Sequence, residues 1–139
     1  MPRSPKVVVT PRPEGKLYLA KAEQFLEACR SANSAAQHDA TMLNAVHAAI
    51  SATDAVTVAL AGRRSSDPDH QRSADLLEQV AGTSPELRAH LRQLRELLSR
   101  KNVVEYESRR TTHREGGDAM RRAERFVEWA AEVVRRAKL

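Results

Sequence analysis

The feature of this sequence that most constrains the fold is an alanine-rich stretch from about Ala35 to Ala61. Its larger apolar side chains recur every three or four residues, which places them on one face of an α-helix. Gly62 follows directly, at the position where helices commonly end in a left-handed residue. The stretch therefore predicts one long helix. Its apolar stripe consists of Met42, Val46, Ala49, Ile50, Val56, Ala59 and Leu60.

Start signals predict further helices on both sides of this one. Pro13 suits the first turn of a helix, and a Ser-Asp-Pro run at 66–68 and a Ser-Pro pair at 84–85 suit helix starts. A Thr-x-x-Glu capping box at 112–115 opens the last helix. The predicted helices cover about residues 13–31 and 35–61, a shorter helix that follows the 66–68 signal and ends at Gly82, residues 85–106, and a last helix that begins at Thr112.

The fold class follows from these helices and from the scarcity of aromatic residues. Only 4% of the 139 residues are aromatic, so the core must be built from Ala, Leu and Val, which suits close helix packing. Residues 1–13 carry four prolines and no helical period, and we expect an extended or disordered lead there. No strand signal is longer than Lys6 to Thr10. The sequence thus predicts an all-α domain over residues 14–139, an antiparallel up-and-down bundle of about five helices.

Several classes of chemistry lack their sequence signals. The single cysteine, Cys29, excludes a disulfide framework and a zinc site of several thiolates, and we expect it to be a small core residue. The five histidines have no metal-ligand spacing, and no glycine-rich phosphate loop is present, so no metal or cofactor is expected. No segment has the ~18 consecutive apolar residues of a membrane span, and no signal peptide is evident, which predicts a cytoplasmic protein.

The charge balance is basic. The net charge of +5 comes mostly from arginine, which suits phosphate and is compatible with a nucleic-acid partner. A solvated arginine-rich surface accounts for the same composition.

Polar residues interrupt the long apolar helix at regular intervals. Asn44, His47, Ser51 and Asp54 are spaced by three, four and three residues, which puts them in one stripe. An exposed helix face would need no further explanation, but the apolar neighbours favour partial burial. We name these four residues the polar stripe and take them as candidate binding residues.

A second polar group lies near the end of the fourth predicted helix. It contains Arg100, Asn102, Glu105 and Tyr106. Basic residues near a helix C-terminus are common because they complement its dipole. In an antiparallel bundle the group can also face the polar stripe, with Arg100 paired by Asp54 or Glu105. This arrangement predicts one shared polar pocket.

The last predicted helix has two unusual features. Gly116 and Gly117 fall in its first turns, which favours a frayed end over a close approach of another segment. Its apolar residues exceed a single stripe and favour a homodimer interface. These apolar residues are Phe126, Val127, Trp129, Ala130, Val133 and Val134.

Three segments together resemble the HEPN superfamily, and more narrowly its small bacterial single-domain members. They are the stretch 44–54 with the polar stripe, the loop from Gly62 to His70, and the run Arg100-Lys-Asn-Val-Val-Glu-Tyr106. The resemblance covers about residues 14–137. It implies a helical bundle that commonly dimerises and often belongs to toxin–antitoxin or related defence systems, beside a nucleotidyltransferase.

The resemblance also implies an active-site pattern. Active members are metal-independent ribonucleases whose signature is an arginine followed four to six residues later by a histidine. Arg100 matches the arginine and Asn102 matches a polar residue often found near it, but Glu105 stands where the histidine belongs and Tyr106 follows. Arg64 and His70 have the same spacing, in a loop between the second and third predicted helices.

These implications lead to one preferred function and two alternatives. The preferred reading is a component of a toxin–antitoxin or related system that binds RNA, a nucleotide or a nucleotidyltransferase partner without efficient cleavage. The first alternative is a metal-independent endoribonuclease toxin with an altered site that uses Arg100, Glu105 and Tyr106, with His47 as a further candidate. The second is a structural dimerisation module. Whether the chain is an enzyme, and whether an antitoxin binds it, stay open at this point.

Overall fold

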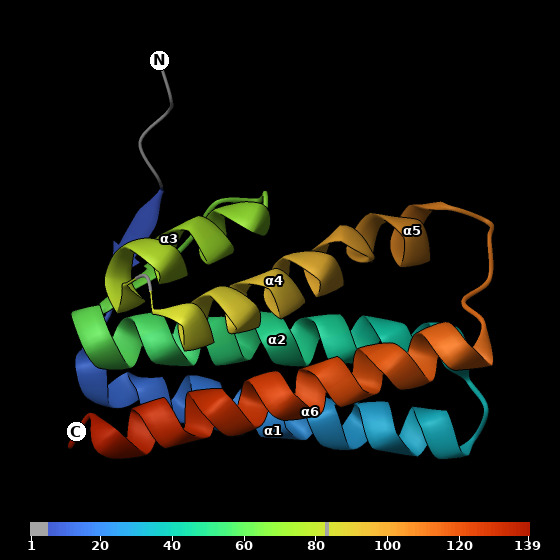
Figure 1. Ribbon diagram of the computed structural model, residues 1–139, viewed down its shortest axis with the longest axis horizontal. Helices are drawn as coiled ribbons and strands as arrows, with labels where there is room; N and C mark the ends of the chain where they lie inside the picture. The colour runs from blue at the N-terminus through green and yellow to red at the C-terminus, as the bar shows by residue number, and fades with distance from the viewer. Residues whose placement is uncertain (1–5, 83) are drawn as a thin grey trace.

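The computed structural model describes residues 6–82 and 84–139, and the predicted all-α bundle is confirmed (Figure 1). Only a small two-stranded sheet accompanies the helices. The elements are β1 (Val7–Val9), a 3-10 turn (Arg12–Glu14), α1 (Gly15–Ser34), α2 (His38–Ala61), β2 (Arg63–Ser65), α3 (Gln71–Ala81), α4 (Pro85–Ser99), α5 (Lys101–Tyr106) and α6 (His113–Arg136).

Helix α2 forms the centre of the bundle, and the other helices pack around it. α1 runs antiparallel to α2 on one side, α6 lies across both, and α3, α4 and α5 lie on the other side of α2 (Figure 1). Most α2 residues are buried, including a continuous run from Ala55 to Ala59. By length and composition α2 alone, among the described residues, could cross a membrane, but most of that stretch is buried inside the protein. Its apolar character is therefore accounted for by its place in the core.

The predicted end signals are confirmed at three helices. Gly62 ends α2 in the left-handed region with φ of 66°. The Ser84 hydroxyl accepts a hydrogen bond from the Leu87 amide at the start of α4. Thr112 and Glu115 form the predicted capping box of α6, each accepting from the other's backbone amide. Local sequence is sufficient here because a cap depends on residues only three positions apart.

The predicted fourth helix is wrong in its length, because the structure divides it. α4 ends at Ser99 and α5 begins at Lys101. At Arg100 the backbone amide bonds to the carbonyl of Leu97, three residues back, so the helix tightens for one turn. No glycine or proline marks this point, which is why the sequence pattern runs through it.

The lead is partly structured. Val7–Val9 pair antiparallel with Arg63–Ser65, so that the lead is held against the end of α2. The Arg12 side chain reinforces this by donating from Nε to the Ala59 carbonyl oxygen at 2.7 Å. An extended lead was predicted, but its strand partner and the 3-10 turn were not. Residues 1–5 of the predicted lead lie outside the described residues.

The structure changes two expectations for the last helix, the frayed start at its glycines and the homodimer interface on its apolar face. Gly116 and Gly117 are buried within a capped helix, so the predicted frayed end is wrong. Phe126, Val127, Ala130 and Val134 are buried within this chain, and Trp129 and Val133 are half-buried against the same core. The apolar excess therefore does not support the homodimer, which stays a prediction from the family resemblance.

Gly15 allows the start of α1 to approach α2 closely. A Cβ atom at this position would lie 2.9 Å from the Ala55 carbonyl oxygen and 3.0 Å from the Ala59 Cβ atom. We therefore expect Gly15→Ala to destabilise the protein by about 1–3 kcal/mol, because the two backbones must move apart. Urea denaturation measures this change.

Gly116→Ala is the matched control for Gly15→Ala. A Cβ atom there would meet the His38 carbonyl oxygen and Thr41 at ordinary contact distances of 3.5 and 3.6 Å. Alanine has a higher helix propensity than glycine by up to about 1 kcal/mol. We therefore expect Gly116→Ala to be at least as stable as the wild type. Equal destabilisation by the two substitutions would contradict the close approach at Gly15.

Candidate functional site

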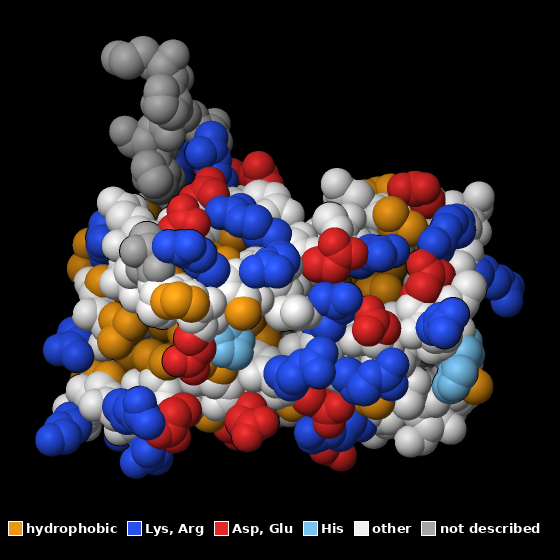
Figure 2. All heavy atoms as spheres, viewed as in Figure 1, with side chains coloured by type: hydrophobic (Ala, Val, Ile, Leu, Met, Phe, Trp, Pro, Cys, Tyr) orange, Lys and Arg blue, Asp and Glu red, His pale blue; other side chains and the backbone are white. Residues whose placement is uncertain are grey.

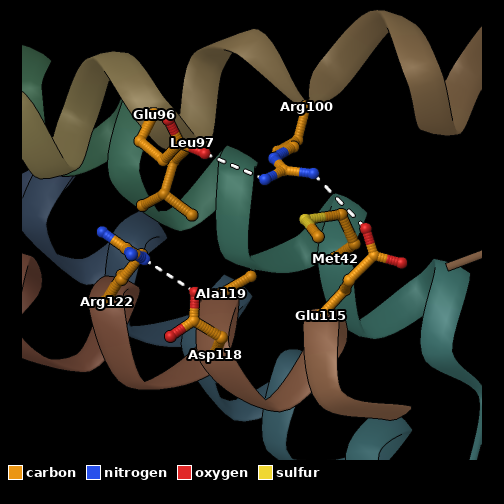
Figure 3. A pocket seen from close by; sticks show the side chains of 8 residues that line it. All are labelled: Met42, Glu96, Leu97, Arg100, Glu115, Asp118, Ala119 and Arg122. Atoms are coloured by element: carbon orange, nitrogen blue, oxygen red, sulfur yellow. Dashed lines mark hydrogen bonds and ion pairs between the residues drawn. The ribbon is translucent and has the colours of Figure 1, made fainter. Parts of the chain in front are cut away.

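Arg100, the arginine that matches the family pattern, points toward α6. Its guanidinium donates to Glu96 at 2.9 Å and to Glu115 at 3.4 Å (Figure 3). Glu115 also accepts from Arg109 at 2.6 Å, and the hydrogen bond from Arg109 is the main reason that the pKa of Glu115 falls to about 2. Arg100 is thus held between the side chains of Glu96 and Glu115, although 38% of its side chain remains exposed.

The cavity beside Arg100 is small. It has a volume of about 50 Å³ and contains Asp118 and Arg122, which form an ion pair of their own at 2.8 Å (Figure 3). Small-molecule sites usually have several hundred Å³. None of the polar-stripe residues lines this cavity. The predicted pocket shared by Arg100 and the polar stripe is therefore not formed, because Arg100 faces α6 instead.

Most of the polar stripe faces α1. Asn44, Ser51 and Asp54 line a pocket of about 580 Å³ between α1 and α2, which we call the α1–α2 pocket. Ser51 is buried, and Asn44 and Asp54 are half-buried, so the partial burial expected from the sequence is what the structure has. The pocket is completed from α1 by Tyr18, Lys21, Gln24, Phe25 and Ala28.

Two residues of the second polar group line a different pocket, together with the loop before α3. This α3–α5 pocket has a volume of about 370 Å³. Asn102 and the 78% exposed Tyr106 belong to it, but Arg100 and Glu105 of the predicted group do not. The lining residues are Pro68, Asp69, His70, Gln71, Leu98, Ser99, Lys101, Asn102 and Tyr106.

Glu105 is held by an ion pair within α5. Lys101 Nζ lies 2.8 Å from Glu105 Oε2, one helical turn away. This hydrogen bond is the main cause that lowers the pKa of Glu105, so its carboxylate is ionised at neutral pH. An ionised carboxylate can accept a proton but has none to donate. At the position where the family carries histidine, this chain therefore has no general acid.

His47 lines neither pocket but lies near residues of both. Its ring centroid lies 5.4 Å from that of Phe25 in the α1–α2 pocket. Burial lowers the pKa of His47, and the nearby charge of Lys101 lowers it further, whereas Glu105 opposes them. The pKa of His70 is lowered in the same way, by burial first and then by Lys101 and His47. Both imidazoles are thus neutral at pH 7, close to one lysine and one carboxylate.

Sequence reasoning missed Lys101 and did not place His70 at the site. The spacing of Arg64 and His70 was visible in the sequence, but the loop that carries them lies far from α5 along the chain. Tertiary packing brings His70 beside Lys101 and brings Arg64 within electrostatic range of Asp54. The signal that could have found His70 was its place in the second segment of the family resemblance.

Cys29 is a buried residue of the core. Burial, the largest cause, raises the pKa of Cys29 to about 11, and its Sγ donates to the Thr41 carbonyl oxygen at 3.3 Å, which fits the predicted core residue. Among the described residues, no three His, Cys, Asp or Glu side chains lie together as metal ligands would.

The outer face over α4 and α6 is electrically mixed. Figure 2 shows basic and acidic side chains side by side across this face. Ion pairs account for part of the pattern, such as Arg95 with Asp75 and Arg122 with Asp118, both at 2.8 Å. Since paired charges cancel at a distance, these ion pairs reduce the positive potential of this face.

Comparison with known proteins places the whole helical bundle in one family. No curated protein matches this sequence. The family model described as HEPN domain matches residues 16–134, which includes all six helices except the ends of α1 and α6. This chain therefore belongs to the HEPN domain family.

Proposed function

We propose that this HEPN protein belongs to a toxin–antitoxin or related defence system and binds RNA without efficient cleavage. The observation that carries the proposal is the state of the two motif positions. Arg100 is held by Glu96 and Glu115, and Glu105 stands in place of the histidine and is held by Lys101. The family pattern uses an unpaired arginine and a proton donor to cleave RNA. These two positions provide neither, so the site lacks the groups that cleavage requires.

The α3–α5 pocket supports RNA binding. Lys101, although ion-paired with Glu105 at 2.8 Å, is the cation at its wall, and Tyr106 offers an exposed ring on which a base can stack. Asn102 and His70 add hydrogen-bonding groups beside them. A lysine, an open aromatic ring and neutral polar groups are a common set for single-stranded nucleic acid.

Substitution of Lys101 tests the binding proposal. Lys101→Ala removes a cation from the pocket, so we expect it to weaken binding of a single-stranded RNA roughly five- to tenfold at 0.1 M salt. Fluorescence anisotropy with a labelled oligonucleotide measures the change. Arg100→Ala is the matched control, because it removes the same charge from the neighbouring residue, which faces α6, and should leave the affinity within about twofold.

Either of two results would refute RNA binding at this pocket. Wild-type protein with no measurable affinity for RNA at low salt, or with an affinity that Lys101→Ala leaves unchanged, would exclude this pocket as the binding site. Loss of binding in Arg100→Ala alone would return the site to the cavity at α6.

A ribonuclease with an altered site is the second candidate function, and the convergence of His47 and His70 favours it. Both imidazoles are neutral and lie near Lys101, so one could accept a proton from a ribose hydroxyl. Incubation with total RNA distinguishes the candidates. Intact RNA supports binding alone, whereas degradation that disappears in a His47→Ala, His70→Ala double variant would establish the ribonuclease.

The remaining implications of the resemblance stay predictions. They are a homodimer, association with a nucleotidyltransferase or antitoxin, and a cytoplasmic location. A protein that binds neither RNA nor nucleotide but elutes as a stable dimer would favour the structural dimerisation module.

A further inference from the structure

The end of the bundle that holds β1 carries most of the exposed large apolar side chains. In the described part of the chain, only Tyr106 among them lies elsewhere. β1, the start of α1 and the end of α2 meet at this end, on the left in Figure 1. Exposed apolar residues that follow one another in a strand differ from the isolated ones found on any surface, and they indicate an interaction site. The exposed residues there are Val7, Val8, Val9, Leu17 and Leu60, and Val9 is 83% exposed.

The outer edge of β1 is open. β1 and β2 form a sheet of two strands, so β2 is the only strand beside β1 in the described residues. The Lys6 carbonyl oxygen and the Thr10 amide each form a hydrogen bond of 2.9 Å to a residue that flanks β2. Backbone groups alternate in direction along a strand, so the amides and carbonyl groups of Val7 and Val9 point away from β2. These groups are left to pair with an added strand.

This end of the bundle is also positively charged. Residues 6–18 and 60–66 contain five cations and one carboxylate, Glu14. Within residues 6–82 and 84–139, none of the five forms an ion pair. Arg12 bonds to a backbone carbonyl oxygen, which leaves its charge uncompensated, while Asp54 offsets part of the charge of Arg64. The five cations are Lys6, Arg12, Lys16, Arg63 and Arg64.

A strand edge with these charges selects its partner. An added strand pairs through backbone amides and carbonyl groups, which a peptide has and a nucleic acid lacks. A second copy of this chain would bring like charges together, and lysine on an edge strand is a common guard against such self-pairing. The register puts Arg63 on the face of Val9 and Lys6 on the opposite face. Acidic side chains on either face of an added strand therefore meet a cation.

We propose that the outer edge of β1 binds an extended acidic segment of another protein as a third strand. Val7 and Val9 exchange backbone hydrogen bonds with this strand, and the valine side chains cover its apolar residues. β1 precedes residue 16, where the match to the HEPN domain model begins, so the site lies outside the part of the chain that the family model describes. It shares no residue with the α3–α5 pocket and does not depend on RNA binding.

Fluorescence anisotropy on the full chain tests the proposal, with a labelled peptide of alternating glutamate and valine as the probe. We expect this peptide to bind at 0.1 M salt, and the same peptide with lysine in place of glutamate to bind at least about tenfold more weakly. Val9→Pro removes an outward-facing amide and should weaken binding of the acidic peptide roughly tenfold. Val9→Ala is the matched control, because it keeps the amide and removes only exposed methyl groups, and should stay within about threefold.

A second pair of variants tests the charges. The double variant Lys6→Ala, Arg63→Ala should weaken binding of the acidic peptide roughly fivefold. The double variant Arg88→Ala, Arg92→Ala removes the same charge from exposed positions of α4 and should change the affinity by less than about twofold.

Hydrogen exchange of the Val7 and Val9 amides in the wild type checks the added strand directly, whatever the stability of the variants. Slower exchange of both amides in the presence of the acidic peptide supports the proposal. No measurable binding, unchanged exchange, equal binding of the two peptides, or equal effects of Val9→Pro and Val9→Ala would overturn it. Displacement of the peptide by single-stranded RNA would instead assign this end to nucleic acid. A wild-type dimer that Val9→Pro dissociates would assign the edge to a second copy of the chain.

Discussion

Asp54→Asn will raise the free energy of unfolding at pH 8 and will remove part of the pH dependence of stability. Burial raises the pKa of Asp54 to about 7, whereas an unfolded chain has the ordinary value of about 3.9. Between these pH values the folded protein keeps a proton that the unfolded chain has released. The contribution of Asp54 is therefore present below about pH 4 and is lost as the pH rises to about 7.

The expected size of this effect is roughly 2–4 kcal/mol in the difference between pH 4 and pH 8. Asparagine is neutral throughout, so the variant should match the wild type near pH 4 and exceed its stability at pH 8. Urea denaturation across this range measures both. The ion pair lowers the pKa of Glu115, so Glu115 reduces the stability as the pH falls, opposite to the effect of Asp54. The contribution of Asp54 is therefore taken from the difference between the wild-type and Asp54→Asn curves.

Glu23→Gln is the control for the pH series. Glu23 is an exposed carboxylate on α1, and its loss should leave the shape of the curve unchanged. Parallel curves for the wild type and Asp54→Asn between pH 4 and pH 8 would show that Asp54 titrates in the folded protein as an ordinary carboxyl group.

Phe126→Ala will destabilise the protein by about 3–5 kcal/mol, the largest loss that we predict for a single substitution. Phe126 is fully buried on α6. Its ring centroid lies 5.5 Å from that of Trp129 and 6.3 Å from that of His90 on α4. Truncation removes the largest fully buried side chain and leaves a cavity where α6 meets α4. The midpoint of urea unfolding, followed by circular dichroism, measures the loss.

Tyr106→Ala is the matched control for Phe126→Ala. It removes an aromatic ring of similar size that is 78% exposed at the end of α5, so we expect a change within about 0.5 kcal/mol. If Phe126→Ala cost no more than this control, α6 would not be packed against the core as described.

The sequence by itself determined most of the helices and the end signals at three of them. The apolar stripe of α2, the serine cap of α4 and the capping box of α6 were all predicted, because each depends on residues a few positions apart. The polar stripe was recognised as a stripe for the same reason. The family followed from three short segments taken together.

Only the tertiary structure decided what these residues face. Arg100 and Lys101 are neighbours in the chain, but consecutive residues on a helix point about 100° apart, so one meets Glu115 and the other lines the α3–α5 pocket. Asp54 was one of two expected partners of Arg100, with Glu105 as the other, and instead lines a pocket against α1. His70 joins Lys101 from a distant loop. Helical periodicity fixes which residues share a face, but the partner of each face depends on how the helices pack, which no local pattern contains.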